Sequence, residues 1–250
     1  MEFQFNHNGQ AYTFESTKFH DLSTPIRNGS ENVNAYYLED PKFEPFRAGD
    51  FVGSVKQGGA CNCEDITFNA HGNGTHTECV GHISDGGQTI NGCLKDFTTM
   101  ALVVSLTPDQ MDNGDKLLSK DSLAQYDLNV IDSLIVRTLP NSTDKKTKRY
   151  SGTNPTYLSP EFTAALAANN IKHLIVDLPS VDREEDGGLL KAHHAFWQYP
   201  DNPRTTSTIT ELAYIPDEVA DGQYLLQIQI AAFESDASPS KPILYPLTEI

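Results

Sequence analysis

One short segment of the chain gathers the residue types that bind metal ions. Between His71 and His82 the sequence reads HGNGTHTECVGH, so three histidines and one glutamate fall within twelve residues. Imidazole nitrogens and carboxylate oxygens are ligands that proteins offer to zinc or manganese. The segment therefore suggests a metal centre. The alternative is three unrelated histidines on the surface or in the core, and local spacing alone does not decide between the two.

The spacing within this segment suits an extended chain. Side chains of a strand alternate between its faces, so His76 and Glu78 share a face, and His82 joins them if the strand continues. His71 is out of phase, because five positions separate it from His76. A β-bulge at residues 72–74, which contain two glycines, would restore the phase. His76, Glu78 and His82 can therefore converge on one point, and His71 joins them if the bulge forms.

Other common catalytic signatures are absent from the sequence. It contains no Gly-x-Ser-x-Gly nucleophile pattern, no Gly-x-x-x-x-Gly-Lys phosphate loop and no dinucleotide-type glycine fingerprint. Cys79 offers a second kind of chemistry, as a thiolate nucleophile beside His76 or His82. In an extended strand the Cys79 side chain would lie on the face opposite to both histidines. This placement favours the metal hypothesis.

Charge and hydropathy narrow the range of partners. Eighteen basic and 34 acidic residues give a formal net charge of −16, which would repel nucleic-acid phosphates and anionic membranes. No apolar run reaches the roughly 20 residues that span a membrane, and the chain begins without a basic and apolar export signal. We therefore expect a cytoplasmic protein that binds a small molecule and neither nucleic acid nor membrane.

The four cysteines, Cys61, Cys63, Cys79 and Cys93, are expected to be reduced. A chain of 250 residues needs no disulfide to fold, and the cytoplasm keeps thiols reduced. Cys61 and Cys63 are separated by a single residue, which is not the paired two-residue spacing of a structural zinc site. Small core or loop residues are the preferred interpretation, and a zinc–thiolate site is the alternative.

Alternating and continuous apolar runs predict a strand-rich protein. Residues 3–14 predict a hairpin, because the dipeptide Asn8-Gly9 adopts the positive φ angles of a tight turn. No repeat or linker divides the chain, so we expect a single domain of residues 1–250. Further strands are expected at residues 66–71, 75–83, 101–106, 133–137, 171–177 and 224–233.

Two helices and one basic loop complete the predicted elements. Ser159-Pro160-Glu161 begins a helix, with a capping hydroxyl, a proline at the first helical position and an acid near the positive end. This helix ends at Asn169-Asn170, and the strand that follows at once is typical of an α/β unit. A second helix is expected from Leu189 to about Trp197. Residues 141–154 carry four basic side chains and predict a solvated loop, with a lid over an anionic substrate as the alternative.

The segment around His76 resembles the signature of the metal-dependent cyclase family, which includes the bacterial kynurenine formamidases. Gly74-Thr75-His76 and His82 match the family pattern His-x-Gly-Thr-His-x-Asp-x-Pro-x-His, and Glu78 stands where the pattern has aspartate. Five further segments resemble the family in the right order along the chain: Asp21 to Ser23, Ile175 to Asp182, Ala192 to Trp197, Thr210 to Leu212, and Gly222 to Tyr224. The resemblance thus covers most of the sequence.

This resemblance implies a set of site residues. It places metal ligands at His76, Glu78, His193 and Glu211, with His71 as a further ligand if the bulge forms, and it makes His82 the proton-transfer residue. His193 is preferred to His194, because adjacent helix residues cannot face the same way and His194 aligns with an arginine of the family.

The chain departs from the family pattern at several positions. An extra residue follows His71, and Gly81 replaces a proline. The carboxylate of Glu78 lies one C–C bond, about 1.5 Å, further from the backbone than that of aspartate, which leaves the number of metal ions open. Residues 199–203 form an insertion rich in turn residues, which could reshape the substrate pocket.

The resemblance also implies a fold and a reaction. The fold is α/β of the swivelling β/β/α type, with a strand-rich mixed sheet or barrel-like core and flanking helices. The reaction is hydrolysis of an amide, formamide, cyclic amide or ester bond. One or two zinc or manganese ions would lower the pKa of a bound water toward about 7, and His82 would pass the proton to the leaving group.

Two further expectations concern the substrate and the assembly. Phe196, Trp197 and Tyr199 lie next to the expected ligand His193, so they either stack on an aromatic substrate or pack in the core. The family resemblance implies a homo-oligomer, most simply a homodimer. The alternative to an enzyme is a family member that binds a metal or a ligand without hydrolysing it.

Overall fold

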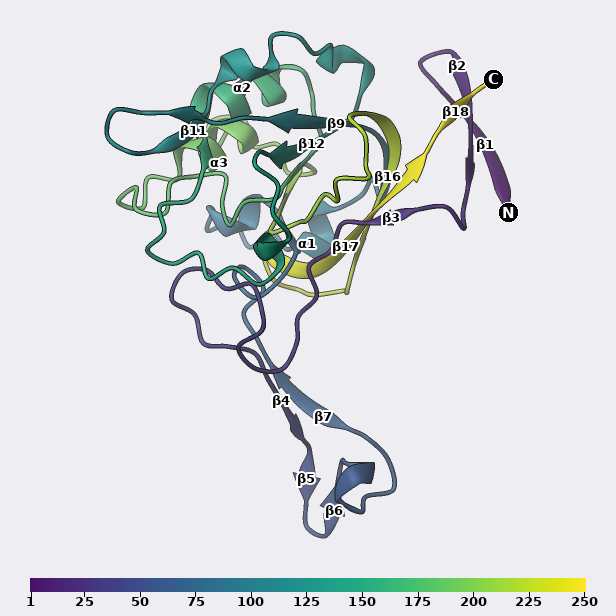
Figure 1. The fold of residues 1–250 in the computed structure, drawn as a ribbon, viewed down its shortest axis with the longest axis vertical. Helices are drawn as coiled ribbons and strands as arrows, with labels where there is room; N and C mark the ends of the chain where they lie inside the picture. Colours follow the sequence, from purple (N-terminus) through teal and green to yellow (C-terminus); the bar gives the residue numbers. More distant parts are fainter.

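The strongly apolar strands of the sequence form a closed barrel at the centre of the protein. A computed structural model describes residues 1–250 (Figure 1). Seven strands follow one another around the barrel in the order β16-β9-β12-β14-β15-β8-β17, and pairing of β17 with β16 closes it. These strands are β8 (His76–Glu78), β9 (Thr98–Leu106), β12 (Ser133–Thr138), β14 (His173–Val176), β15 (Thr208–Glu211), β16 (Gly222–Ile230) and β17 (Ala237–Pro246).

The barrel mixes parallel and antiparallel pairs. Strands β9, β12, β14 and β15 run parallel to one another, whereas β8, β16 and β17 pair antiparallel with their neighbours. A short additional strand, β3 (His20–Asp21), pairs with β17 outside the closed ring. The predicted strand-rich α/β fold with a mixed, barrel-like core is thus confirmed.

Both faces of the central parallel strands β12 and β14 are buried. On β12, Ile135 belongs to the apolar cluster inside the barrel, while its neighbours Leu134 and Val136 belong to the cluster outside it. The outer cluster packs against α2 (Pro160–Ala168) and α3 (Lys191–Trp197). Burial on two faces explains why the apolar residues of β12 and β14 are continuous rather than alternating.

The helices are short and lie mostly beside the barrel. The Ser159 hydroxyl accepts a hydrogen bond from the Phe162 amide at 3.1 Å and caps α2, as predicted from the sequence. The second predicted helix is confirmed as α3. The remaining helical turns are α1 (Ile90–Cys93), η1 (Val55–Gln57), η2 (Val80–His82), η3 (Lys120–Leu123), η4 (Leu128–Val130) and η5 (Thr143–Lys146).

Several smaller sheets lie outside the barrel. The predicted hairpin is confirmed, with positive φ at Asn8 and Gly9, and Figure 1 shows it beside the C-terminus. A second ribbon projects from the body of the protein as an arm, at the bottom of Figure 1. The hairpin sheet contains β1 (Glu2–His7), β2 (Gln10–Glu15) and β18 (Thr248–Glu249); the arm contains β4 (Lys42–Pro45), β5 (Arg47–Ala48), β6 (Phe51–Val52) and β7 (Glu64–Thr67); a third sheet contains β10 (Asp109–Gln110), β11 (Lys116–Leu118) and β13 (Tyr157–Leu158).

Two predicted strands near the histidines were wrong in extent. The strand expected at residues 66–71 ends at Thr67, because the arm ends there and a turn follows. The strand expected at residues 75–83 ends at Glu78, and the chain turns into η2. The strands expected at 101–106, 133–137, 171–177 and 224–233 are confirmed as β9, β12, β14 and most of β16.

The basic segment 141–154 is held by ion pairs on the body of the protein. The Lys145 ammonium lies 2.7 Å from the Asp177 carboxylate, which is fully buried, and Arg149 lies 2.6 Å from Asp40. None of the four basic side chains lines the cavity described below. These contacts and the absence of the four side chains from the cavity lining favour a loop over the lid alternative. No helix of the protein has the length and apolar character needed to cross a membrane.

Candidate metal centre

The short strand β8 forms the base of the candidate site. Its Thr77 side chain bonds Thr210 on one face, while His76 and Glu78 share the other face, as their spacing predicts. His76 lies directly opposite Glu211 of β15 in the antiparallel register. The two side chains consequently meet, with His76 Nε2 3.5 Å from Glu211 Oε2.

His71 and His82 reach this face through turns, which the alternation of side chains along a strand does not predict. His71 follows β7 in a turn rather than a bulged strand, and its Nδ1 lies 3.2 Å from Glu78 Oε2. His82 stands on η2, because β8 has already ended, and its Nδ1 lies 3.9 Å from the same oxygen. Convergence of the segment is therefore observed, but through tight turns instead of continued strand parity.

Helix α3 brings His193 into the cluster from the far end of the chain. His193 is buried, and its Nε2 lies 3.0 Å from Glu78 Oε1 and 3.7 Å from Glu211 Oε1. The other ring nitrogen, Nδ1, lies 2.6 Å from Asp182 Oδ2. His194 points elsewhere and bonds the Tyr199 carbonyl, so the structure brings His193, and not His194, to the other candidate ligands.

Asp182 holds both His193 and the start of its helix. Its carboxylate accepts hydrogen bonds from the backbone amides of Ala192 and His193 at 2.8 and 3.1 Å, in addition to the imidazole contact. A carboxylate behind a ligand histidine fixes the ring and its tautomer. Asp182 ends the segment Ile175 to Asp182 that resembles the family, but its contact with His193 is seen only in the fold.

Two buried polar atoms of the cluster have no hydrogen-bond partner, namely His76 Nε2 and Glu78 Oε2. The His76 ring donates from Nδ1 to the Gly74 carbonyl at 3.1 Å, which leaves a lone pair on Nε2. Buried polar atoms without partners are costly, and a lone pair and a carboxylate oxygen are suitable donors for a divalent cation. The donor set therefore fits a metal ion.

Opposite charges balance within the cluster. Burial alone would raise the pKa of Glu78, but the neighbouring His82 and His193 outweigh that effect and hold the pKa well below its ordinary value. Burial opposes a charge on His193 as well, yet its contacts with Asp182 and Glu78 raise its pKa to about 10. Because metal ligands must give up such protons, cation binding at this site would release protons.

One acidic residue of the cluster was missed in the sequence. Asp236 precedes β17, and its Oδ2 lies 2.9 Å from His71 Nε2 and 3.1 Å from His82 Nδ1. His71, His82 and Asp236 form a group close enough to hold an ion, as do two other groups of the cluster. No motif surrounds Asp236 in the sequence, so only the closure of the barrel reveals its place.

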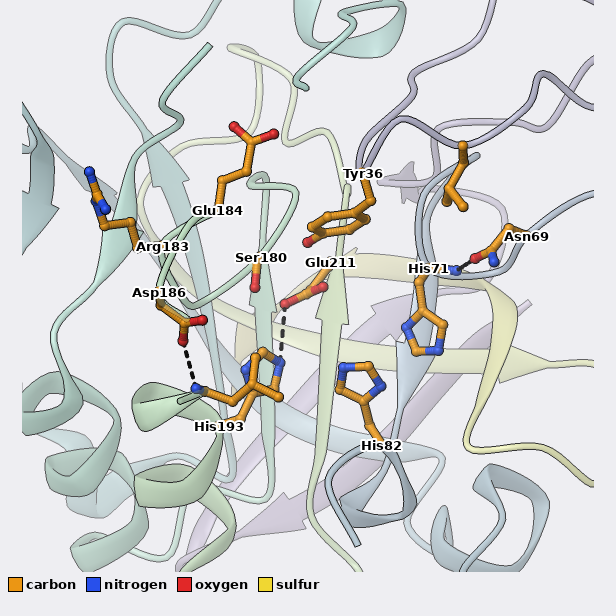
Figure 2. Close-up of a pocket in the computed structure, with 12 residues that line it drawn as sticks. Tyr36, Asn69, His71, His82, Ser180, Arg183, Glu184, Asp186, His193 and Glu211 are labelled. Carbon is orange, nitrogen blue, oxygen red and sulfur yellow. Dashed lines mark hydrogen bonds and ion pairs between the residues drawn. The ribbon is translucent and has the colours of Figure 1, made fainter. Parts of the chain in front are cut away.

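A cavity of about 350 Å³ opens onto the cluster. Figure 2 shows His71, His82, His193 and Glu211 gathered below the ring of Tyr36. Tyr36 is fixed by a hydrogen bond from its hydroxyl to the Pro179 carbonyl at 2.6 Å. Leu38 and Leu190 line the cavity as well, and several polar side chains complete the lining: Asn69, Ser180, Arg183, Glu184 and Asp186.

The aromatic residues after His193 do not line this cavity. Phe196 and Trp197 are completely buried in the apolar cluster outside the barrel, and the Trp197 indole donates to the Ser207 carbonyl at 2.8 Å. Tyr199 packs against the same cluster. Core packing, the second of the two alternatives, is therefore correct. The insertion 199–203 also contributes no residue to the cavity lining.

None of the cysteine side chains belongs to the histidine–carboxylate cluster. Cys79 is buried in the cluster inside the barrel, and its contact with Cys93, together with burial, raises the pKa of its thiol well above the ordinary value. A buried thiol of this kind is no nucleophile, so the thiolate alternative is wrong. Cys61 and Cys63 are exposed on the arm.

Comparison with known proteins agrees with the barrel and its histidine–carboxylate cluster, which together define a candidate metal-binding enzyme. The family model described as "Putative cyclase" matches residues 20–183. The kynurenine formamidase of Bacillus cytotoxicus is 28% identical over 235 residues, which are 93% of this chain and 100% of that protein. The chain belongs to the cyclase family.

Solved structures share the fold at low sequence identity. A potential metal-dependent hydrolase with cyclase activity superposes with a TM-score of 0.67 at 18% identity, over 91% of this chain and 97% of that one. Isatin hydrolase A from Labrenzia aggregata, bound to benzyl benzoate, gives a TM-score of 0.65 at 13% identity, over 91% and 93% of the two chains. These similarities confirm the expected cyclase-like architecture.

Proposed function

We propose that residues 1–250 form one hydrolase domain that uses a divalent cation to cleave an amide, formamide, cyclic amide or ester bond. The observation that carries the proposal is the meeting of histidines and carboxylates from distant parts of the chain beside a cavity. Two of their buried atoms, His76 Nε2 and Glu78 Oε2, make no hydrogen bond in the protein, although Glu211 Oε2 and His71 Nδ1 lie 3.5 and 3.2 Å from them. Such an arrangement is costly for folding and suited to binding a cation.

The proposed ligands are Glu78, the histidines grouped with it, and the carboxylate that contacts two of those histidines, namely Glu78, His71, His76, His193 and Glu211. One or two ions of zinc or manganese are compatible with this mixture of nitrogen and oxygen donors. A cation held there would lower the pKa of water and polarise the scissile carbonyl.

The residues of the chain would supply binding and proton transfer. His82 lines the cavity, and its hydrogen bonds involve only Nδ1, so Nε2 is available to exchange a proton with the substrate. Imidazole suits this task because it titrates near neutral pH. Tyr36 and Leu190 would contact the part of the substrate that does not react.

We propose a small aromatic amide as the substrate class. The named relatives support this choice, since one is a kynurenine formamidase and another an isatin hydrolase. The cavity of about 350 Å³, lined by Tyr36, Leu38 and Leu190, is large enough for a bicyclic ring or a substituted benzene.

A panel assay tests the proposal. The protein is stripped with a chelator, divided, and reloaded with zinc or manganese before assay on N-formylkynurenine, isatin, small lactones and imides. We expect hydrolysis only after reloading. Full activity of the stripped protein would refute the metal mechanism, and tight metal binding without hydrolysis of any compound would favour a non-catalytic binding protein. The homo-oligomer that the family resemblance implies is tested separately, by measuring the molar mass of the same samples in sedimentation.

A further inference from the structure

Asp236 is held at the candidate site by its backbone. It directly precedes Ala237, the first residue of β17, which pairs with Glu78 in the antiparallel register. The Asp236 carbonyl also accepts a hydrogen bond from the Cys79 amide at 3.0 Å. The closure of the barrel therefore fixes this carboxylate beside the end of β8.

One carboxylate oxygen of Asp236 forms hydrogen bonds with two histidines. Oδ2 lies 2.9 Å from His71 Nε2 and 3.1 Å from His82 Nδ1, while Oδ1 accepts a hydrogen bond from the Ser235 hydroxyl at 3.0 Å. Both imidazole distances are those of hydrogen bonds. The side chain is 31% exposed, whereas Glu78 is fully buried on the other edge of the His71 ring.

An ionised carboxylate only accepts hydrogen bonds, so both of these ring nitrogens must carry hydrogen. In neutral His71 the lone pair then lies on Nδ1, which faces Glu78 Oε2 at 3.2 Å. In neutral His82 the lone pair lies on Nε2, which has no partner in the protein. Asp236 thus selects the tautomer that each ring needs for the role proposed above.

We infer that Asp236 is a positioning residue of the hydrolytic centre, which sets His71 to bind the cation through Nδ1 and His82 to exchange protons through Nε2. This inference rests on the proposed function. The single carboxylate of Asp236 would then have two roles, because it orients both a metal ligand and the proton-transfer residue. Partners of this kind behind metal ligands affect metal affinity or activity by about 10- to 100-fold.

The test measures tautomers in the zinc-loaded protein by long-range ¹H–¹⁵N NMR, which needs no substrate. In the unaltered protein we expect hydrogen on His82 Nδ1 and zinc on His71 Nδ1. In Asp236→Ala we expect His82 to change to the Nε2–H form and the zinc affinity, measured by competition with a chelator, to fall about 10- to 100-fold. An unchanged His82 tautomer, or zinc on His71 Nε2, would overturn the inference.

Two further variants complete the experiment. Glu234→Gln removes the same charge from the same segment, but Glu234 bonds Thr89 and Asn91 instead of the histidines, so tautomers and zinc affinity should not change. If Asp236→Ala fails to fold, Asp236→Leu replaces it, since leucine fills a similar space but has no oxygen to accept a hydrogen bond from either ring. Tautomers that depend on Asp236 without hydrolysis of any panel compound would refute the proposed function and leave intact only the orientation of the two histidine rings by Asp236.

Discussion

Glu78 is the residue around which the candidate centre is arranged. Its two oxygens face different histidines, with Oε1 3.0 Å from His193 Nε2 and Oε2 3.2 Å from His71 Nδ1. The family pattern has the shorter aspartate at this position. Here the additional methylene extends the carboxylate between a histidine from a loop and one from α3. The distances therefore show how the longer side chain can still serve both rings.

The proposed role of His82 predicts a separation of turnover from metal content. His82→Ala removes the proton-transfer group but none of the proposed ligands, so turnover should fall about 100- to 10,000-fold while the bound metal, measured by atomic emission, stays unchanged. His194→Ala is the control, because His194 is the adjacent helix neighbour of His193 but bonds the Tyr199 carbonyl. Retained turnover in His82→Ala would show that another group moves the proton.

His173 predicts an acid-sensitive stability that is independent of the site. It is fully buried inside the barrel, bonds Thr208 at 2.8 Å through Nδ1, and leaves Nε2 without a partner. Burial lowers its pKa to about 4, whereas the unfolded chain has a histidine pKa of about 6.5. The unfolded state thus binds more protons between these values, and stability falls as the pH drops through 6.5 toward 4.

The expected loss from His173 is about 3 kcal/mol between pH 8 and pH 4. His173→Asn can keep the bond to Thr208 but cannot take up a proton, so its free energy of unfolding in urea should depend less on pH. His7→Asn, on the peripheral hairpin, is the control and should follow the unaltered protein. Equal pH dependence of His173→Asn and the unaltered protein would contradict the assignment.

At the scale of elements, α2 supports α3, and α3 carries His193. The two helices pack together outside the barrel, and the Thr163 hydroxyl of α2 donates to the Ala192 carbonyl of α3 at 2.8 Å. The start of α3 is fixed separately by Asp182. The position of His193 therefore depends on a helix pair as well as on its own side-chain contacts.

The α2 cap predicts a measurable cost for a single hydroxyl. Ser159→Ala removes the acceptor of the Phe162 amide and should lower the free energy of unfolding by about 1 kcal/mol. Ser54→Ala is a matched control, because Ser54 begins η1 without a side-chain capping bond. Urea titration compares the two variants, and equal losses would show that the Ser159 hydroxyl does not stabilise α2.

Elements with strong local signals could be predicted from the sequence, and those defined by distant pairing could not. Ser159 and Pro160 determine where α2 begins, and Asn8-Gly9 determines the first turn. Strand β17 was not predicted, because its prolines at positions 239, 242 and 246 interrupt a strand pattern. It forms nevertheless, since β8 and β16 supply partners on either side.

The candidate site shows the same division. The types and spacing of His76 and Glu78 predict a shared face, which the structure has. His71 and His82 were expected to share a face with His76 along one long strand. In the structure both residues lie in turns. The alternation of side chains along a strand does not predict the geometry of a turn. Asp236 depends on β17 and was missed with it. The family resemblance, rather than local physics, supplied His193 and Glu211 at the sequence level.

At the scale of the whole molecule, the closed barrel brings distant charges together. The candidate ligands come from positions 71 to 211, and Glu78 and Glu211 are buried within a protein whose formal net charge is −16. Mutual repulsion among acids opposes the compact state. In this cluster the histidines offset the repulsion, and a divalent cation would offset it further.

Cation binding should therefore raise the thermal stability of the entire protein. A ligand that binds only the folded state at 100 times its Kd stabilises by about 2.7 kcal/mol, which corresponds to an increase in Tm of about 5–10 °C for a chain of this size. Calorimetry of chelator-treated protein with and without added zinc measures the change. His76→Ala should lose most of this increase, because it removes the unpartnered Nε2. An identical Tm with and without zinc would mean that these side chains, although assembled by the barrel, do not hold a cation.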